Sequence, residues 1–107
     1  MATRKMMLVD HDNTNSGGWF NEYITTSGVS DIYKMPLQPI TSIGASISGT
    51  GYLEFSISAP IMLEANTATF EPWDGVAQIN PAVTGFRAVS TSGMIVANVT
   101  VKTFYAS

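Results

Sequence analysis

Apolar and polar residues alternate along much of this chain with the period of two that an extended strand requires. The clearest case lies in residues 52–59, where every second residue is apolar and the residues between them are Glu or Ser. The apolar set is Leu53, Phe55, Ile57 and Ala59. Because successive side chains of a strand point to opposite faces, this pattern predicts one face in the core and one in contact with water or a partner.

Segments with turn composition divide the alternating regions into two predicted hairpins. Ser48–Gly51 contains two glycines, so the alternating residues on either side of it are expected to pair as a hairpin. A second hairpin is expected from strands at residues 83–90 and 94–105, joined by a turn at residues 91–93. The residues expected to face inward from its longer strand are Ile95, Ala97, Val99 and Val101.

Three further segments are rich in β-branched and aromatic residues and predict strands: Lys5–Val9, Trp19–Thr25 and Thr67–Phe70, the last ended by Pro72. No segment shows the period of a helix. Seven or eight short strands with turns at this spacing are typical of an antiparallel β-sandwich or a small jelly roll, an all-β fold. The side chains expected in its core are Leu53, Phe55, Ile57, Phe86, Ile95, Val99 and Val101.

The size and charge of the chain then suggest how such a domain is used. Its 107 residues fit one β domain spanning residues 1–107, in which residues 1–9 are either an N-terminal arm or the first strand. Charged residues make up only 12% of the chain, about half the share of an ordinary soluble domain. A surface made mainly of Ser, Thr, Gly and Asn suits a protein that is covered by other chains, so we expect a homo-oligomer.

The charge balance excludes some partners. With five Lys and Arg residues and a net charge of −3, the chain lacks the basic patch that binding to nucleic acid or an anionic membrane requires. The apolar run Met6–Val9 is too short for a signal peptide, and no apolar stretch approaches membrane-spanning length. We therefore expect a protein made in the cytoplasm without a signal peptide.

Candidate chemistry centres on His11, the single histidine, which lies between Asp10 and Asp12. A general base oriented by a carboxylate is one interpretation, but adjacent residues of an extended chain point apart and no nucleophile motif accompanies them. There is no cysteine for nucleophilic or thiolate chemistry. The expectation is therefore a protein that is not an enzyme and uses no cofactor.

A cation site is the other interpretation of this segment. Asp10 and Asp12 are followed by Asn and Thr residues, which offer the hard oxygen ligands that Ca²⁺ prefers. The spacing does not match an EF-hand loop, because Asn15 and Asn21 occupy the positions of its glycine and its bidentate glutamate. A non-standard calcium site around Asp10 and Asp12 stays open beside a plain turn.

A few residues are candidates for contacts between chains. Trp73 lies in a segment of turn-forming residues, and Trp19 is next to another aromatic residue. The methionines are adaptable apolar groups. Arg87, in mid-strand, is either an interface anchor or a partner of Glu54 or Glu71. Residues 2–9 and 35–40 are expected to reach a neighbour as extended arms. The full candidate set is Trp73, Arg87, Met6, Met7, Met35, Pro36, Pro39 and Trp19.

The aromatic residues also leave open a carbohydrate-binding module. In that alternative Trp73 and Tyr52 would stack on the apolar face of a sugar ring.

Three segments carry a resemblance to the small β-rich virion proteins of tailed bacteriophages. They are the glycine-rich approach to an aromatic pair (residues 17–20), the polar segment SIGASISGTGYLEFSIS, and the ending INPAVTGFRAVSTSGMIVANVTVKTF. Together they cover 47 of the 107 residues, a little under half of the chain, and none is a specific catalytic motif.

The resemblance implies a structural role in the virion. Such proteins decorate or cement capsids, form head fibres or build tail parts, are commonly homo-oligomers and often trimers, and bind a major capsid or other virion protein. Because the chain has no long repetitive shaft, capsid decoration fits it better than a tail or head fibre.

Overall fold

The structure is a computed structural model, and it describes residues 3–12, 17–36, 40–73 and 83–103. These ranges contain seven strands and one short helix. In chain order they are β1 (Thr3–Lys5), β2 (Met7–Asp12), β3 (Gly17–Thr26), β4 (Ile32–Lys34), β5 (Ile40–Ser56), α1 (Pro60–Glu64), β6 (Glu71–Pro72) and β7 (Gly85–Thr103).

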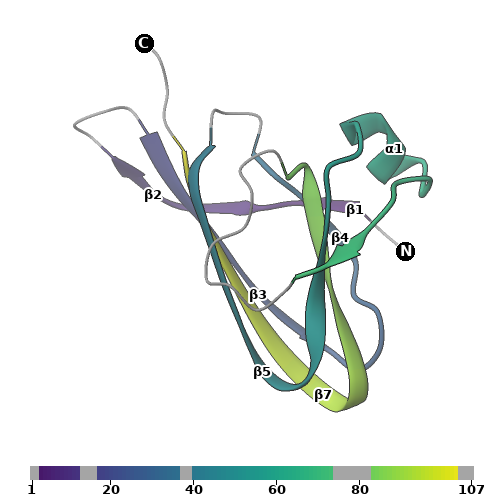
Figure 1. Cartoon of the computed structure of the whole chain (residues 1–107). Helices are drawn as coiled ribbons and strands as arrows, with labels where there is room; N and C mark the ends of the chain where they lie inside the picture. Colours follow the sequence, from purple (N-terminus) through teal and green to yellow (C-terminus); the bar gives the residue numbers. More distant parts are fainter. Residues whose placement is uncertain (1–2, 13–16, 37–39, 74–82, 104–107) are drawn as a thin grey trace.

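All seven described strands belong to one mixed, nearly closed sheet with a barrel-like shape (Figure 1). Five of them follow the order β1-β4-β7-β3-β2, and β5 pairs with both β7 and β6. The pairing of β1 with β4 is parallel and the other pairings are antiparallel. The all-β class is confirmed, but the chain is not clearly an antiparallel sandwich or jelly roll.

The two predicted hairpins are wrong, because their turns lie inside two long strands. Residues 48–51 belong to β5, and residues 91–93 belong to β7. The strands of 17 and 19 residues pair with each other along their whole length, from Ile40↔Thr103 to Ser56↔Gly85. Figure 1 shows them descending side by side, turning together at the bottom of the view and rising again.

Extra residues in β7 explain this shared bend. Between the pairs Ser48↔Val96 and Gly51↔Ser90, β5 advances three residues and β7 advances six, with register shifts at each step. Because β7 contributes more residues here than β5, it follows the longer, outer path and the two paired strands bend together. The bend lies where the sequence predicted turns. Gly49 and Gly93 adopt positive φ angles of 108° and 69° at this point, a conformation that favours glycine.

The bend divides the sheet into two leaves. We call the β3 leaf the part formed by β2, β3, residues 40–48 of β5 and residues 95–103 of β7. The β4 leaf contains β1, β4, β6, residues 51–56 of β5 and residues 85–90 of β7. One apolar cluster joins the inner residues of both leaves, including Phe20, Val99 and Val101 from the first and Leu53 and Phe86 from the second.

The predicted core is confirmed for five of its seven residues. Leu53, Phe86, Ile95, Val99 and Val101 are at most 1% exposed. Phe55 is partly buried against the cluster, and its prediction holds only in part.

Ile57 is 62% exposed, so its prediction is wrong. The strand β5 ends at Ser56, and Thr84 donates hydrogen bonds to the carbonyls of Ser56 and Ser58. The alternation cannot continue past the end of the strand, because the chain leaves the sheet there.

Helix α1 was not expected from the sequence. Pro60 stands at its first turn, and Asn66 just beyond its end has a φ of 58°. The amides of Asn66 and Thr67 donate to the carbonyls of Leu63 and Met62, which is a Schellman motif. Five residues are too few for a period to be visible, so these capping residues are the signal that could have identified it.

Two other strand predictions need correction. Residues 67–70 are not a strand, and the short β6 follows them at Glu71–Pro72. The predicted first strand is two strands, β1 and β2, separated by Met6. Residues 3–9 are therefore integral to the sheet rather than a free arm.

Candidate functional site

The outer face of the β3 leaf carries an almost uncharged set of side chains. Cross-strand register aligns alternate residues of three neighbouring strands on this face. They are Trp19, Asn21, Tyr23 and Thr25 of β3, Ser42, Gly44, Ser46 and Ser48 of β5, and Val96, Asn98, Thr100 and Lys102 of β7. We call these twelve residues the outer face; Lys102 is the one charged residue among them.

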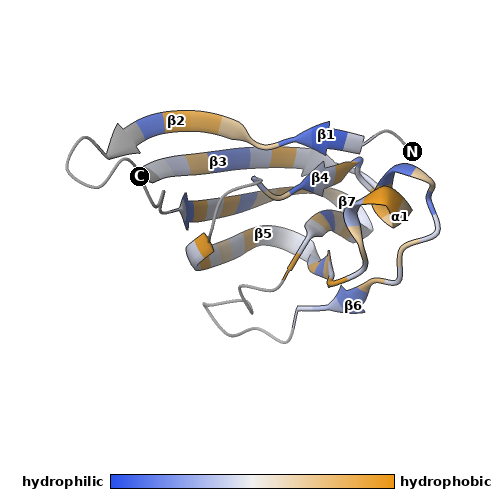
Figure 2. Ribbon diagram, turned by 90° about the horizontal axis from the view of Figure 1, so that it is seen from above, coloured by the Kyte–Doolittle hydropathy of each residue, from blue (hydrophilic) through white to orange (hydrophobic). Residues whose placement is uncertain are grey.

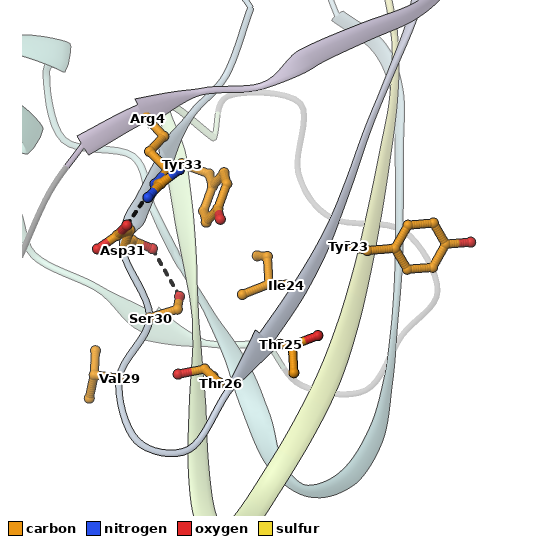
Figure 3. Close-up of a pocket in the computed structure, with 9 residues that line it drawn as sticks. All are labelled: Arg4, Tyr23, Ile24, Thr25, Thr26, Val29, Ser30, Asp31 and Tyr33. Atoms are coloured by element: carbon orange, nitrogen blue, oxygen red, sulfur yellow. Dashed lines mark hydrogen bonds and ion pairs between the residues drawn. The ribbon is translucent and has the colours of Figure 1, made fainter.

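Two aromatic rings stand out on the outer face. Tyr23 is 70% exposed, and its ring points away from the other side chains labelled in Figure 3. Trp19 is 38% exposed, and the Lys102 ammonium lies 5.1 Å from the centroid of its ring. The cation occupies one side of the indole, which holds the ring in place and leaves less of it for stacking on a ligand.

A hydrogen-bond network fixes the centre of the outer face. The side-chain amide of Asn21 donates to Asn98 Oδ1 at 2.6 Å and to Thr100 Oγ1 at 2.7 Å, and lies 3.3 Å from the Val99 carbonyl oxygen. These bonds tie β3 to β7 through side chains as well as through the backbone ladder. Side chains that are already ordered in this way lose less conformational entropy when a partner binds.

Strand β2 forms one edge of the sheet and exposes consecutive apolar residues. Met7, Leu8 and Val9 are 66%, 39% and 57% exposed. In the strand order β2 is terminal, so only β3 pairs with it among the described strands. Figure 2 shows the hydrophobic stretch of β2 along the outer edge of the sheet. Exposed apolar edges of this kind attract further strands.

The predicted contact residues lie in different parts of the structure, some of them in the core. Met6 and Met35 are only 7% and 6% exposed and belong to the core cluster, which contradicts the expectation that they face a partner. Met35 is held there by the bond from its amide to the Thr84 carbonyl. Pro36 is half-buried, and Pro39 lies outside the described residues.

Arg87 and Trp73 lie on the other leaf. The Arg87 Nε donates to Glu54 Oε1 at 2.7 Å, and its guanidinium lies 4.1 Å from the centroid of the Phe70 ring. This is the pairing with Glu54 that the sequence left open. Trp73 packs against the core cluster, and its buried Nε1 has no acceptor among the described residues.

A polar cleft of about 460 Å³ opens between β1, β3 and the segment that leads into β4 (Figure 3). Arg4 Nε donates to Asp31 Oδ2 at 2.6 Å along one side of it. The Tyr33 ring, which lines the cleft, stacks on the Phe86 ring with 5.5 Å between the ring centroids. Thr26 and Ser30 also line the cleft. Eight of its nine lining residues come from residues 23–33, and Arg4 joins them only when β1 pairs with β4.

Three groups among the described residues have displaced pKa values. The hydrogen bond to Asp31 and the charge of that carboxylate raise the pKa of Arg4. Burial raises the pKa of the Tyr33 hydroxyl, because the charged form would lose water. The hydrogen bond from Lys34, at 2.9 Å, lowers the pKa of Glu64. At neutral pH Tyr33 therefore stays protonated and able to donate.

The segment around His11 lies in strand β2 rather than in a turn. Asp10 pairs with Trp19 and Asp12 with Gly17 in the register of β2 and β3, while Asn15 lies outside the described residues. Within the described ranges, no group of three or more His, Asp or Glu side chains is placed to hold a metal ion.

Comparison of the chain with protein-family models, with curated proteins and with solved structures finds no match. Among the residues that the structure describes, no helix has the length and apolar character needed to cross a membrane.

Proposed function

We propose that the chain is a structural virion protein of a tailed phage, which decorates or cements the capsid by protein contacts and has no catalytic role. Its sequence resemblance to such proteins and its low charge support this proposal. In this role the protein associates with itself and with a major capsid or other virion protein, and it resides in the virion.

The observation that carries the proposal is the outer face of the β3 leaf. Aromatic anchors surrounded by Ser, Thr, Asn and Gly, with few charges, are typical of surfaces that bind proteins. Tyr23 and Trp19 provide the anchors, and the Asn21 network keeps the strands beneath them rigid. Docking of this face buries apolar rings without leaving a charge unpaired, apart from Lys102.

The carbohydrate-binding alternative has less support from the described residues. Of its two proposed rings, only Tyr52 is exposed, because Trp73 packs against the core cluster. On the outer face, Lys102 already covers part of Trp19. A component of a tail or head fibre remains the alternative within the virion class, and it differs in location rather than in the kind of contact.

Mass spectrometry and electron microscopy of virions from the phage that encodes the chain provide the first test. The expected result is a stoichiometric protein on the capsid surface with the outer face of the β3 leaf against the shell. Its absence from purified particles would overturn the proposal, and a position on the tail would favour the fibre alternative.

A pair of tyrosine variants tests the docking face. Tyr23→Ala is expected to weaken binding of the purified protein to capsids that lack it by about thirtyfold, because aromatic anchors at the centre of an interface contribute about 2 kcal/mol. Tyr52→Ala, on the other leaf, is the matched control and should bind as the parent does. Equal binding by both variants would contradict the assignment of the face.

A further inference from the structure

We infer that the polar cleft between β1, β3 and the segment leading into β4 binds a neutral saccharide through Arg4, Asp31 and Tyr33. The inference goes beyond the proposed function, because these three residues do not belong to the outer face that docks on the shell. The cleft borders that face at Tyr23 and Thr25.

The cleft lies between inner-face residues of the two leaves. Cross-strand register places Arg4 beside Tyr33 and Tyr33 beside Phe86, so these side chains share one face of the β4 leaf. Phe86 is 1% exposed and belongs to the core cluster, so this face is the inner one. From the β3 leaf, the buried Ile24 lines the same cleft. The mouth of a barrel is a common place for a ligand site, and a volume of about 460 Å³ suits a small molecule.

Hydrogen bonds hold one wall of the cleft in place. The Ser30 hydroxyl donates to the Asp31 carbonyl at 2.9 Å and accepts from the Ala88 amide at 2.8 Å. The Ser30 amide donates to the Ala88 carbonyl at 2.9 Å. Figure 3 shows the Arg4 head group beside Asp31, where Nε donates to Oδ2 at 2.6 Å. These groups are ordered before a ligand arrives, which lowers the entropic cost of binding.

The ion pair of Arg4 and Asp31 presents hydrogen-bond donors and acceptors side by side. A guanidinium has five N–H donors in one plane, and Nε is the one that Arg4 uses among the described residues. The Arg4 side chain is 62% exposed and the Asp31 side chain 32%, so both are accessible. Neighbouring hydroxyl groups of a sugar each donate and accept, which matches such a pair. Tyr33 and Ile24 offer apolar surface to the C–H groups of the sugar ring.

The charges around the cleft favour a neutral ligand. Asp31 compensates Arg4, so an anion would meet the carboxylate and a cation would meet the guanidinium. Glu22 shares the inner face of β3 with Ile24 and adds a second negative charge, where its Oε1 accepts from the Met7 amide at 2.9 Å. A sugar without charge makes the same hydrogen bonds and meets no like charge.

NMR titration of the purified chain with free sugars tests the inference. Glucose, galactose, mannose and N-acetylglucosamine are the probes, and at least one is expected to shift the backbone amides of residues 23–33 saturably. The Kd should be roughly millimolar, because the ligand is small and the cleft open. No saturable shift with any of the four sugars would overturn the inference.

Charged sugars test the ligand class. At mildly acidic pH, glucosamine is a cation and glucuronate an anion, and both are otherwise similar to the neutral probes. Each is expected to bind more weakly than the best neutral sugar, because each meets a like charge in the cleft. Tighter binding of either one would show that the site is not one for neutral ligands.

Two variants assign the binding groups. Asp31→Asn should weaken binding of the best sugar about tenfold, because it removes a charged acceptor. Tyr33→Phe should weaken it about fivefold, because it removes the hydroxyl and keeps the ring that stacks on Phe86. Glu64→Gln is the matched control and should bind as the parent does, because Glu64 forms its ion pair with Lys34 instead. The amide spectrum of each variant reports its folding in the same experiment.

Parent-like binding by both Asp31→Asn and Tyr33→Phe would contradict the site. Shifts centred on Tyr52 would also contradict it, and would support the carbohydrate-binding alternative on the other leaf. The titration uses the purified chain without capsids, so its result and the result of the capsid-binding test with Tyr23→Ala are independent.

Discussion

Gly51 stands where β5 changes direction, and its lack of a side chain is a steric requirement. A Cβ atom built there would clash with the Val89 carbonyl oxygen and lie 2.9 Å from Ile95 Cδ1. The first neighbour is backbone within the paired ladder, so it cannot move without breaking the pairing of Gly51 with Ser90. Gly93, on the partner strand, differs because a Cβ there would meet no atom within 4 Å.

The two glycines therefore predict unequal costs for the same substitution. Gly51→Ala is expected to lower the free energy of unfolding by about 3 kcal/mol, because the ladder must open to accept the methyl group. Gly93→Ala should cost about 1 kcal/mol, from its positive φ alone. Urea unfolding of the two variants measures the difference, and similar midpoints would show that the bend does not depend on close contact at Gly51.

At the scale of elements, α1 is a short cap over the β4 leaf that depends on one side chain. Leu63 is fully buried, and its Cδ1 lies 2.8 Å from the position that a Cβ on Gly85 would occupy. The Thr3 hydroxyl donates to the Leu63 carbonyl, and Lys34 pairs with Glu64 at 2.9 Å. The ion pair is largely exposed on the Glu64 side, so the apolar contact carries the docking.

Truncation of Leu63 tests this dependence. Leu63→Ala is expected to destabilise the protein by roughly 2–5 kcal/mol, the range for removing a buried leucine side chain. Ile61→Ala, in the same helix and 75% exposed, should change the stability by less than about 0.5 kcal/mol. Thermal or urea unfolding of the pair is the measurement, and an equal loss in both would mean that α1 acts through helix propensity rather than through packing.

At the scale of the whole molecule, β7 is the central strand of the sheet. It pairs with β5 along its full length, with β3 over residues 95–103 and with β4 near its start. The other strands are peripheral by comparison, and β2 and β6 each pair with one neighbour among the described strands. Protection of backbone amides should follow this order, because edge strands can open without disrupting the core.

Hydrogen exchange followed by mass spectrometry checks this prediction. Peptides from residues 95–101 of β7 and the facing part of β5 are expected to exchange slowest, near the rate set by global unfolding. Peptides from β6 and α1 should exchange first. Uniform exchange across the sheet would contradict a structure organised around β7.

Local patterns predicted most of the core and one strand of the candidate surface. The alternation from Ile95 to Val101 placed those side chains correctly, because a period of two determines which residues share a face wherever a strand is continuous. It also predicted a strand from Trp19 to Thr25, and β3 spans Gly17–Thr26. The prediction failed at Ile57, where the strand ends before the pattern does.

Other features depended on contacts between residues distant in sequence. The composition of Ser48–Gly51 is compatible both with a turn that ends a strand and with a bend inside a strand. Pairing with residues 90–96 decides between the two. Met6 and Met7 are chemically alike, yet one is 7% and the other 66% exposed, because the transition from β1 to β2 turns only the first inward.

The sequence by itself therefore determined the all-β class, the strand faces and the low charge, since these follow from residue type and local periodicity. The tertiary structure alone decided that β5 and β7 form one bent ladder, that β1 runs parallel to β4, and that Arg4 meets Asp31. Such choices depend on the relative free energies of alternative strand pairings, which are set by packing across the whole core rather than by any one segment.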